Sequence, residues 1–338
     1  METPKRNWLF TYPRTASNLL LKVLDLKSQP TTYPGNGLFL PIMMTRQGQL
    51  MKAQLDPSKL SDEDRTALMT AYTNAVNKIT SAAPSDAPLF ISEHACWITE
   101  PVARCKAMLG TSPSEDSWTV PIPGFDPTHS PANETFLPDA FLLSFAPSFI
   151  IRHPALALTS MYRAQRDMYG PEMALRSIQA PWWHEVTSVK PTRKLYDWYR
   201  SQFPHYEASA NGNGTNGHSS PVQWPIVLDA DDILTSPSIV EKYAAATGLD
   251  ATKLKFSWEP ERKPGEKFLG PKFQERFSDT IANSTGIRQD KKAGEIDLAK
   301  EVEGWREEFG EEAAGELEKR LEEEMGDWEY LRGRRLGA

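Results

Sequence analysis

Short apolar runs alternate with amphipathic segments along the first two thirds of the chain. Residues 7–12 form a short run rich in apolar side chains, which is consistent with a buried strand. Pro13 follows this run, and apolar residues then recur at helical spacing over residues 17–27. The pattern predicts a strand, a tight turn and a helix, which is the opening of an α/β unit.

The same alternation continues toward the C-terminus. Further apolar runs predict strands at residues 88–91, 148–151 and 224–228. Helices are predicted at residues 62–82, 155–168 and 190–203. A long loop is expected at residues 111–138, which are rich in Pro, Ser and Gly. Strands that alternate with helices favour the α/β class, with a central, mostly parallel sheet flanked by helices.

The C-terminal segment has a different pattern. Apolar residues at spacings of three and four between residues 298 and 328 form one stripe on a helix whose other face is acidic. Three glycines are expected to divide this helix: Gly304, Gly310 and Gly315. We expect residues 293–338 to pack as an acidic helical segment on an α/β domain of residues 1–292, although an interaction tail is the alternative.

Charge is unevenly distributed between these two parts. The 338 residues include 38 basic and 45 acidic side chains, a net charge of −7. Residues 293–332 hold 15 acidic and 5 basic side chains, so the remainder has 33 basic against 30 acidic groups, or +3. The overall acidity therefore does not exclude an anionic ligand on the body of the protein.

Composition argues against several classes of protein. No apolar run approaches the roughly 20 residues of a membrane span, and the N-terminal residues do not resemble a secretory signal, so we expect a cytoplasmic protein without a membrane or nucleic-acid partner. Cys96 and Cys105 are then expected to be reduced, and no ligand spacing predicts a metal. Oligomeric state cannot be read from the sequence.

Residues 208–221 are expected to form a flexible insertion. They match the G-x-G-x-x-G pattern of dinucleotide sites, but polar residues precede the glycines and Pro221 follows them. A dinucleotide site needs a strand before the glycines and a helix after them. The composition therefore indicates a linker.

The first candidate site is the turn after the first strand. The helix expected from Ser17 would present unpaired backbone N–H groups there, an arrangement that binds phosphate. Arg14 adds a planar positive fork, and further side-chain donors are present at Thr15, Ser17 and Asn18. The alternative is a capped helix beside a surface arginine. The turn lacks the glycines and lysine of a Walker A loop, which argues against ATP hydrolysis.

The second candidate site follows the strand at residues 148–151. Arg152 would lie at the carboxyl end of this strand, the edge at which open α/β sheets bind ligands. Ser160, eight residues further on the expected helix, could face the same way. A structural ion pair for Arg152 and a helix-surface position for Ser160 are the alternatives.

Together these segments resemble the PAPS-dependent sulfotransferases. Tyr-Pro-Arg-Thr-Ala-Ser-Asn at residues 12–18 resembles the family's 5′-phosphosulfate loop, and Arg152 with Ser160 resembles its 3′-phosphate motif. Phe-Ile-Ser-Glu-His at residues 90–94 resembles the strand that ends in the family's catalytic histidine. Residues 225–234 are more weakly similar to a later strand and turn, so the resemblance spans about residues 7–260.

The resemblance implies a three-layer sandwich like that of P-loop NTPases and a sulfonate transfer from PAPS to a hydroxyl of a small-molecule acceptor, without a metal. Adenosine 3′,5′-bisphosphate would be the product. His94 would be the catalytic base and Arg14 would stabilise the transferring sulfonate. The implied donor-binding residues are Arg14, Thr15, Ala16, Ser17, Asn18, Arg152 and Ser160, joined by Arg262 and Lys263 in a late basic loop.

Three residues depart from the family's usual pattern. Arg14 replaces a lysine, Ala16 a glycine and Ser92 a residue that is often lysine. Arginine keeps the charge but does not readily release a proton, and a β-carbon at Ala16 would crowd the turn. These departures leave two alternatives: a relative that has lost PAPS use and handles a small molecule by other chemistry, or a non-catalytic nucleotide-binding interaction protein.

Overall fold

A parallel sheet organises the computed structural model, which describes residues 5–45, 56–84, 86–112, 118–202, 222–261, 272–288 and 294–337. Within these ranges the sheet has four strands in the order β2-β1-β3-β4, and all neighbours are parallel. The strands are β1 (Arg6–Thr11), β2 (Leu89–His94), β3 (Ala146–Ile151) and β4 (Ile226–Asp229). The predicted α/β class with a parallel sheet is confirmed.

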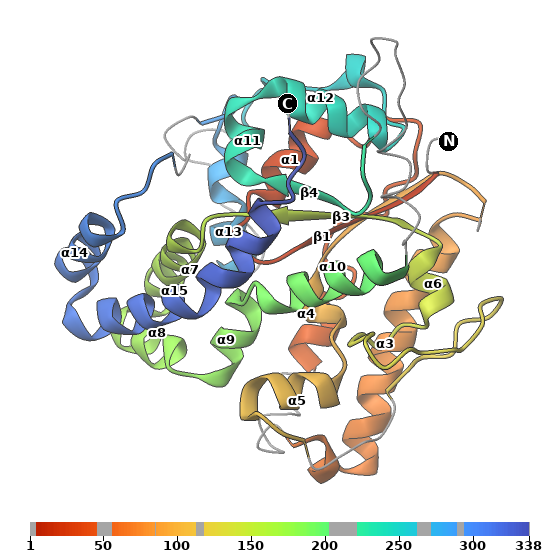
Figure 1. Cartoon of the computed structure of the whole chain (residues 1–338), viewed down its shortest axis with the longest axis horizontal. Helices are drawn as coiled ribbons and strands as arrows, with labels where there is room; N and C mark the ends of the chain where they lie inside the picture. Colours follow the sequence, from red (N-terminus) through yellow and green to blue (C-terminus); the bar gives the residue numbers. More distant parts are fainter. Residues whose placement is uncertain are drawn as a thin grey trace.

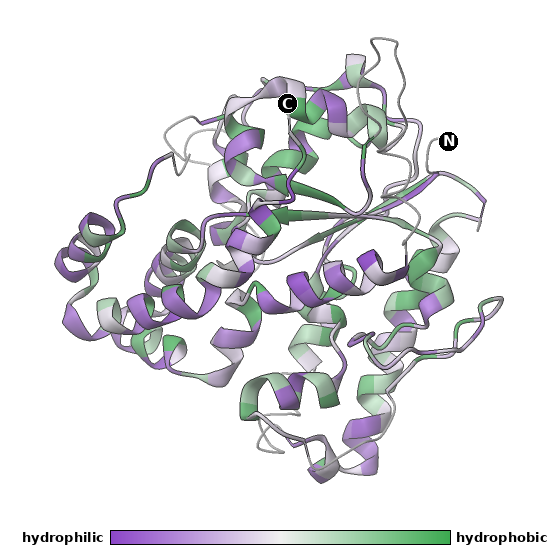
Figure 2. Cartoon of the chain, viewed as in Figure 1, coloured by the Kyte–Doolittle hydropathy of each residue, from purple (hydrophilic) through white to green (hydrophobic). Residues whose placement is uncertain are grey.

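Alternating side chains of the strands bury two separate cores. Trp8 and Phe10 of β1 point into one apolar cluster, while Leu9 between them belongs to the cluster on the opposite face. This period of two explains why a buried strand is apolar at every position. Figure 2 shows hydrophobic stretches in the sheet, most clearly in β4, and alternating hydrophobic and hydrophilic stretches along the surrounding helices.

Helices cover both faces of the sheet (Figure 1). On one face lie α1 (Ser17–Leu24), α11 (Ala230–Thr235) and α12 (Pro237–Ala246). On the other lie α3 (Asp62–Ala82), α4 (Ala95–Ile98), α5 (Pro101–Leu109), α6 (Asp139–Leu143) and α10 (Lys190–Gln202). The result is a three-layer arrangement of helix, sheet and helix.

A third group of helices packs beyond the carboxyl ends of the strands. It comprises α7 (Pro154–Tyr169), α8 (Pro171–Ile178), α9 (Pro181–Thr187), α13 (Lys272–Ala282), α14 (Leu298–Phe309) and α15 (Glu311–Arg332). Most of them share an apolar cluster that includes Leu158, Trp183 and Trp305. Short 3₁₀ turns at Pro57–Lys59 (η1) and Ala251–Lys253 (η3) complete the described elements.

The C-terminal stripe forms two helices rather than several. Gly310, at a φ of 87°, ends α14 and begins α15, whereas Gly304 and Gly315 lie inside the helices and do not break them. Trp328 of α15 packs on His153, with ring centroids 4.4 Å apart. The division of the chain near residue 292 stays a prediction.

Two loop predictions have different outcomes. Residues 118–138 contain no helix or strand, as expected of the long loop, while the adjoining residues 113–117 lie outside the described ranges. The first helix is shorter than predicted, because Asp25 adopts a left-handed conformation, with φ 45°, that ends α1 at Leu24. The insertion at residues 208–221 also lies outside the described part of the chain.

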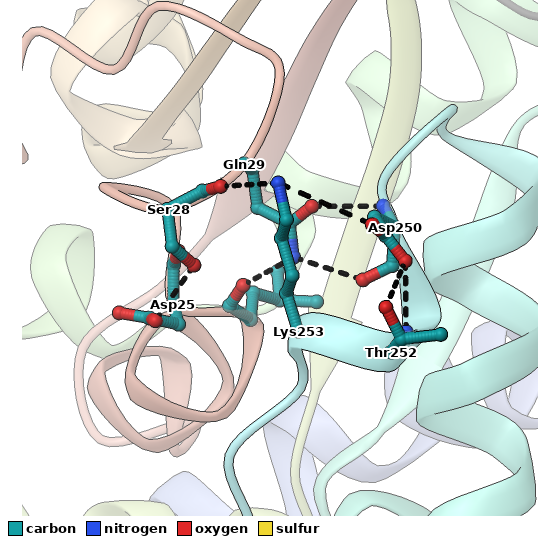
Figure 3. A network of polar contacts seen from close by, with 7 residues as sticks. Asp25, Ser28, Gln29, Asp250, Thr252 and Lys253 are labelled. Atoms are coloured by element: carbon teal, nitrogen blue, oxygen red, sulfur yellow. Dashed lines mark hydrogen bonds and ion pairs between the residues drawn. The ribbon is translucent and has the colours of Figure 1, made fainter.

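The C-terminal end of α1 is fixed by a polar network (Figure 3). Gln29 donates from Nε2 to the carbonyl oxygen of Leu24 at 2.9 Å and accepts the backbone N–H of Asp250 at 2.8 Å. Lys253 Nζ donates to the carbonyl oxygen of Ser28 at 2.8 Å.

In the described part of the chain, no helix combines the length and the apolarity that crossing a bilayer requires.

Candidate functional site

The turn between β1 and α1 is built from strained backbone. Arg14 and Ala16 both have left-handed conformations, with φ of 72° and 63°. Such values are uncommon outside glycine and concentrate at functional sites. Ala16 is the N-cap residue of α1, and its methyl group cannot accept a hydrogen bond from the first turn. The helix therefore keeps its N-terminal N–H groups available to an external acceptor.

The strain at Ala16 leads to a stability prediction. Glycine adopts a φ of 63° without the steric cost of a β-carbon, so Ala16→Gly should stabilise the fold by about 1 kcal/mol in urea denaturation. Ala180 is the matched control, because it is also a helix N-cap but has a φ of −83°. If Ala180→Gly stabilises the protein as much as Ala16→Gly does, backbone strain at Ala16 is not the cause.

The two predicted anion-binding segments are joined by direct hydrogen bonds. Arg14 Nε donates to Ser160 Oγ at 2.9 Å, and Arg152 Nη1 donates to the carbonyl oxygen of Arg14 at 3.0 Å. Tyr12 connects the strand ends, since its hydroxyl donates to the carbonyl oxygen of Arg152 at 2.6 Å and accepts the N–H of Arg152 at 3.0 Å. Residues separated by about 140 positions therefore form one site.

Positive charge is concentrated at this junction. The pKa of Arg14 is lowered to about 10, first by burial and then by the nearby guanidinium groups of Arg276 and Arg152. Burial also lowers the pKa of Arg152. Arg14 lies 5.3 Å from the ring centroid of Phe277, and Arg276 pairs with Asp167 at 2.6 Å. Like charges this close favour an anion between them, which would relieve their repulsion.

His94 lies at the end of the neighbouring strand. It pairs in register with Thr11 of β1, and its Nδ1 lies 2.5 Å from Thr11 Oγ1. Trp97 packs edge-on against the imidazole, with centroids 4.3 Å apart. Burial lowers the pKa of His94 to about 3, so the imidazole is neutral at physiological pH. A neutral imidazole has the lone pair that a base needs, although a pKa this low makes it a weak base in the free protein.

The remaining predicted residues occupy different surroundings. Thr15 is buried and donates its hydroxyl to the carbonyl oxygen of Tyr12 at 2.9 Å, so this hydroxyl closes the turn. Ser17 is partly exposed and Asn18 is exposed in the first turn of α1, while Ser92 is buried in β2. The late basic pair, Arg262 and Lys263, lies outside the described residues.

Sequence reasoning did not single out Glu93, although it precedes His94. The Glu93 carboxyl accepts the backbone N–H of Leu38, and burial raises its pKa to about 8, with the N–H groups of residues 37–39 opposing the shift. Glu93 thereby holds the chain segment beside Asn36, which donates to Asn18 Oδ1 at 3.3 Å. An acidic residue inside an apolar strand was the available signal.

Sequence reasoning also missed Arg276, whose charge acts on Arg14 because α13 packs against α7 and α1. Among the residues that the structure describes, no three His, Cys, Asp or Glu side chains gather as a metal site would require.

Comparison with known proteins finds two similar relatives. The chain is 35% identical over 345 residues to "Sulfotransferase ppzF" of Metarhizium majus, covering 99% of this chain and 98% of that relative. It is also 35% identical over 346 residues to "Sulfotransferase ppzF" of Metarhizium rileyi, covering 99% of this chain and 97% of the relative. No family profile and no solved structure matches it. Because both similarities extend over nearly the whole chain, this protein belongs to the sulfotransferase family, as a divergent member.

Proposed function

We propose that this protein transfers a sulfonate group from PAPS to a hydroxyl group of a small-molecule acceptor. The observation that carries the proposal is the contact between Arg14, Ser160 and Arg152, which unites the two predicted anion-binding segments in one positive site. The names of the two relatives support a sulfotransferase activity.

The predicted donor-binding residues suit PAPS, which has a 5′-phosphosulfate and a 3′-phosphate on its ribose. The open N-terminus of α1 would take the 5′-phosphosulfate, through the backbone N–H groups of Thr15, Ala16 and Ser17 and through the side chain of Asn18. Arg152 and Ser160 would take the 3′-phosphate. Arg262 and Lys263 are proposed to add positive charge there.

The chemistry is divided between two strand ends. When bound, PAPS supplies an activated sulfonate on a good phosphate leaving group. His94 would accept the hydroxyl proton as the acceptor oxygen bonds to sulfur and the bridging sulfur–oxygen bond breaks. Arg14 would stabilise the charge on the departing phosphate, because its guanidinium stays protonated even with a pKa of about 10. The products would be the sulfated acceptor, adenosine 3′,5′-bisphosphate and a proton.

Calorimetric titration with adenosine 3′,5′-bisphosphate tests donor binding. We expect micromolar affinity for the wild-type protein and at least tenfold weaker binding for Arg152→Gln, since a charged contact to phosphate contributes about 1.5–3 kcal/mol. No binding at millimolar ligand would contradict the proposal and favour a relative that has lost PAPS use. Binding without any sulfonate transfer would favour a nucleotide-binding interaction protein.

Arg163 is the matched control for Arg152. It lies on α7, the helix that follows Arg152 in the chain, but its partly exposed side chain pairs with Glu308 at 2.6 Å. Arg163→Gln should leave the affinity unchanged, because this guanidinium is already engaged with a carboxylate. Equal weakening by both substitutions would indicate a general charge effect rather than a site at Arg152.

A further inference from the structure

A buried hydroxyl group between two strands lies within hydrogen-bond distance of the His94 imidazole. Thr11 is 1% exposed, and its Oγ1 has two neighbours: His94 Nδ1 at 2.5 Å and the carbonyl oxygen of Glu93 at 3.4 Å. A carbonyl oxygen can only accept, whereas a hydroxyl can donate one proton and accept another. The position of the proton in one contact therefore limits its position in the other.

Only one proton arrangement satisfies both contacts. The Thr11 hydroxyl donates to the Glu93 carbonyl, and its lone pair accepts a proton from His94 Nδ1. The reverse arrangement, with the hydroxyl donating to Nδ1, leaves the contact with the carbonyl without a proton. Because the hydroxyl is buried, water cannot compensate for that loss.

We propose that Thr11 is a positioning residue that holds His94 in the tautomer with its proton on Nδ1. Nε2 then carries the lone pair, as a base acting on an acceptor hydroxyl requires. This inference rests on the proposed function for its catalytic meaning, but the tautomer itself is a property of the free protein. When His94 takes a second proton on Nε2, Thr11 still accepts from Nδ1, so nothing in this contact must rearrange.

The surroundings of the ring support this assignment. Strand register places Thr11 opposite His94, and Trp97 packs edge-on on the imidazole, which restricts its rotation. The other tautomer would present an N–H at Nε2, which cannot accept the acceptor's proton. The structure thus links a backbone carbonyl, a hydroxyl and an imidazole in one chain of hydrogen bonds.

Nitrogen NMR of histidine-labelled free protein tests the tautomer directly, with His94→Gln used to assign the His94 signals. We expect a protonated Nδ1 in the wild type and in Thr11→Ser, which keeps the hydroxyl. Thr11→Val preserves the shape but removes the hydroxyl, and should move the population toward protonated Nε2. A wild type protonated on Nε2, or a Thr11→Val spectrum identical to the wild type, would overturn the inference.

Kinetics gives the second readout. Thr11→Val should lower kcat about tenfold with little change in KM, and Thr11→Ser should restore it, as expected for a partner that orients a functional histidine. Thr187→Val is the control, because Thr187 is also buried and donates to a backbone carbonyl, that of Trp183, at 2.7 Å. It should change neither the His94 tautomer nor kcat. Since the NMR test uses no donor, its failure is distinguishable from failure of the nucleotide titration.

Discussion

Replacing His94 with glutamine should lower kcat for sulfonate transfer by a factor of about 10²–10⁴, the usual contribution of a general base. Glutamine keeps a polar side chain of similar reach but has no lone pair basic enough to take the hydroxyl proton. The affinity for adenosine 3′,5′-bisphosphate should stay within about twofold, because binding is assigned to Arg152 and the start of α1. The measurement is release of this product from PAPS in the presence of phenol and alcohol acceptors.

His184 is the control for this substitution. It lies on α9, where its Nδ1 contacts Arg320, and it belongs to the outer helical group rather than to the strand ends. His184→Gln should retain wild-type turnover. If His94→Gln retains turnover as well, His94 is not the base, whereas a parallel loss of nucleotide affinity would indicate that the substitution had disturbed the donor site.

Replacing Glu185 with glutamine should destabilise the protein by about 3–5 kcal/mol, the largest effect on stability that we expect. Glu185 of α9 and Arg104 of α5 form an ion pair, and their side chains are only 6% and 5% exposed. Glutamine preserves the shape but removes the charge that compensates the buried guanidinium. The midpoint of urea unfolding, at an unchanged slope, measures the loss.

Two further variants test the cause of that loss. Glu308→Gln breaks the ion pair between Glu308 and Arg163, in which both side chains are 43% exposed. This substitution should cost less than about 1 kcal/mol of stability, because solvent screens the pair. The double variant Arg104→Met, Glu185→Leu should recover most of the stability, because two apolar side chains of similar volume pack together and leave no buried charge unpaired. If Glu185→Gln costs no more than Glu308→Gln, the buried pair does not stabilise the fold.

The elements around the candidate site were predictable because they carry strong local signals. β1 and β3 are apolar runs ended by Pro13 and Pro154, and the helix of residues 62–82 has an acidic first turn behind its N-cap, Ser61. Of the helices that the structure describes, eight were not predicted: α4, α5, α6, α8, α9, α11, α12 and α13. The clearest cases are α4, α6 and α9. They have four to seven residues, too few for a helical period to show, and they form because tertiary packing buries them.

The C-terminal segment shows the same limit of prediction from sequence. Its apolar stripe lies on α14 and α15, where Leu317 is fully buried. Which glycine would end a helix was not predictable from the sequence. Glycine is tolerated inside a helix, and only the packed backbone determines which glycine adopts a positive φ. Gly310, with its positive φ, separates α14 from α15.

By itself, the sequence determined the α/β class and predicted a turn rich in possible anion donors, a second basic strand end and a histidine, since each is a local pattern of residue types. Tertiary structure alone decided how they meet. Arg14 reaches Ser160 across 146 positions, and Thr11 reaches His94 across 83, because parallel strands bring their carboxyl ends to one edge of the sheet. The pKa of His94 and the position of Arg276 depend on packing from distant elements, which no local pattern records.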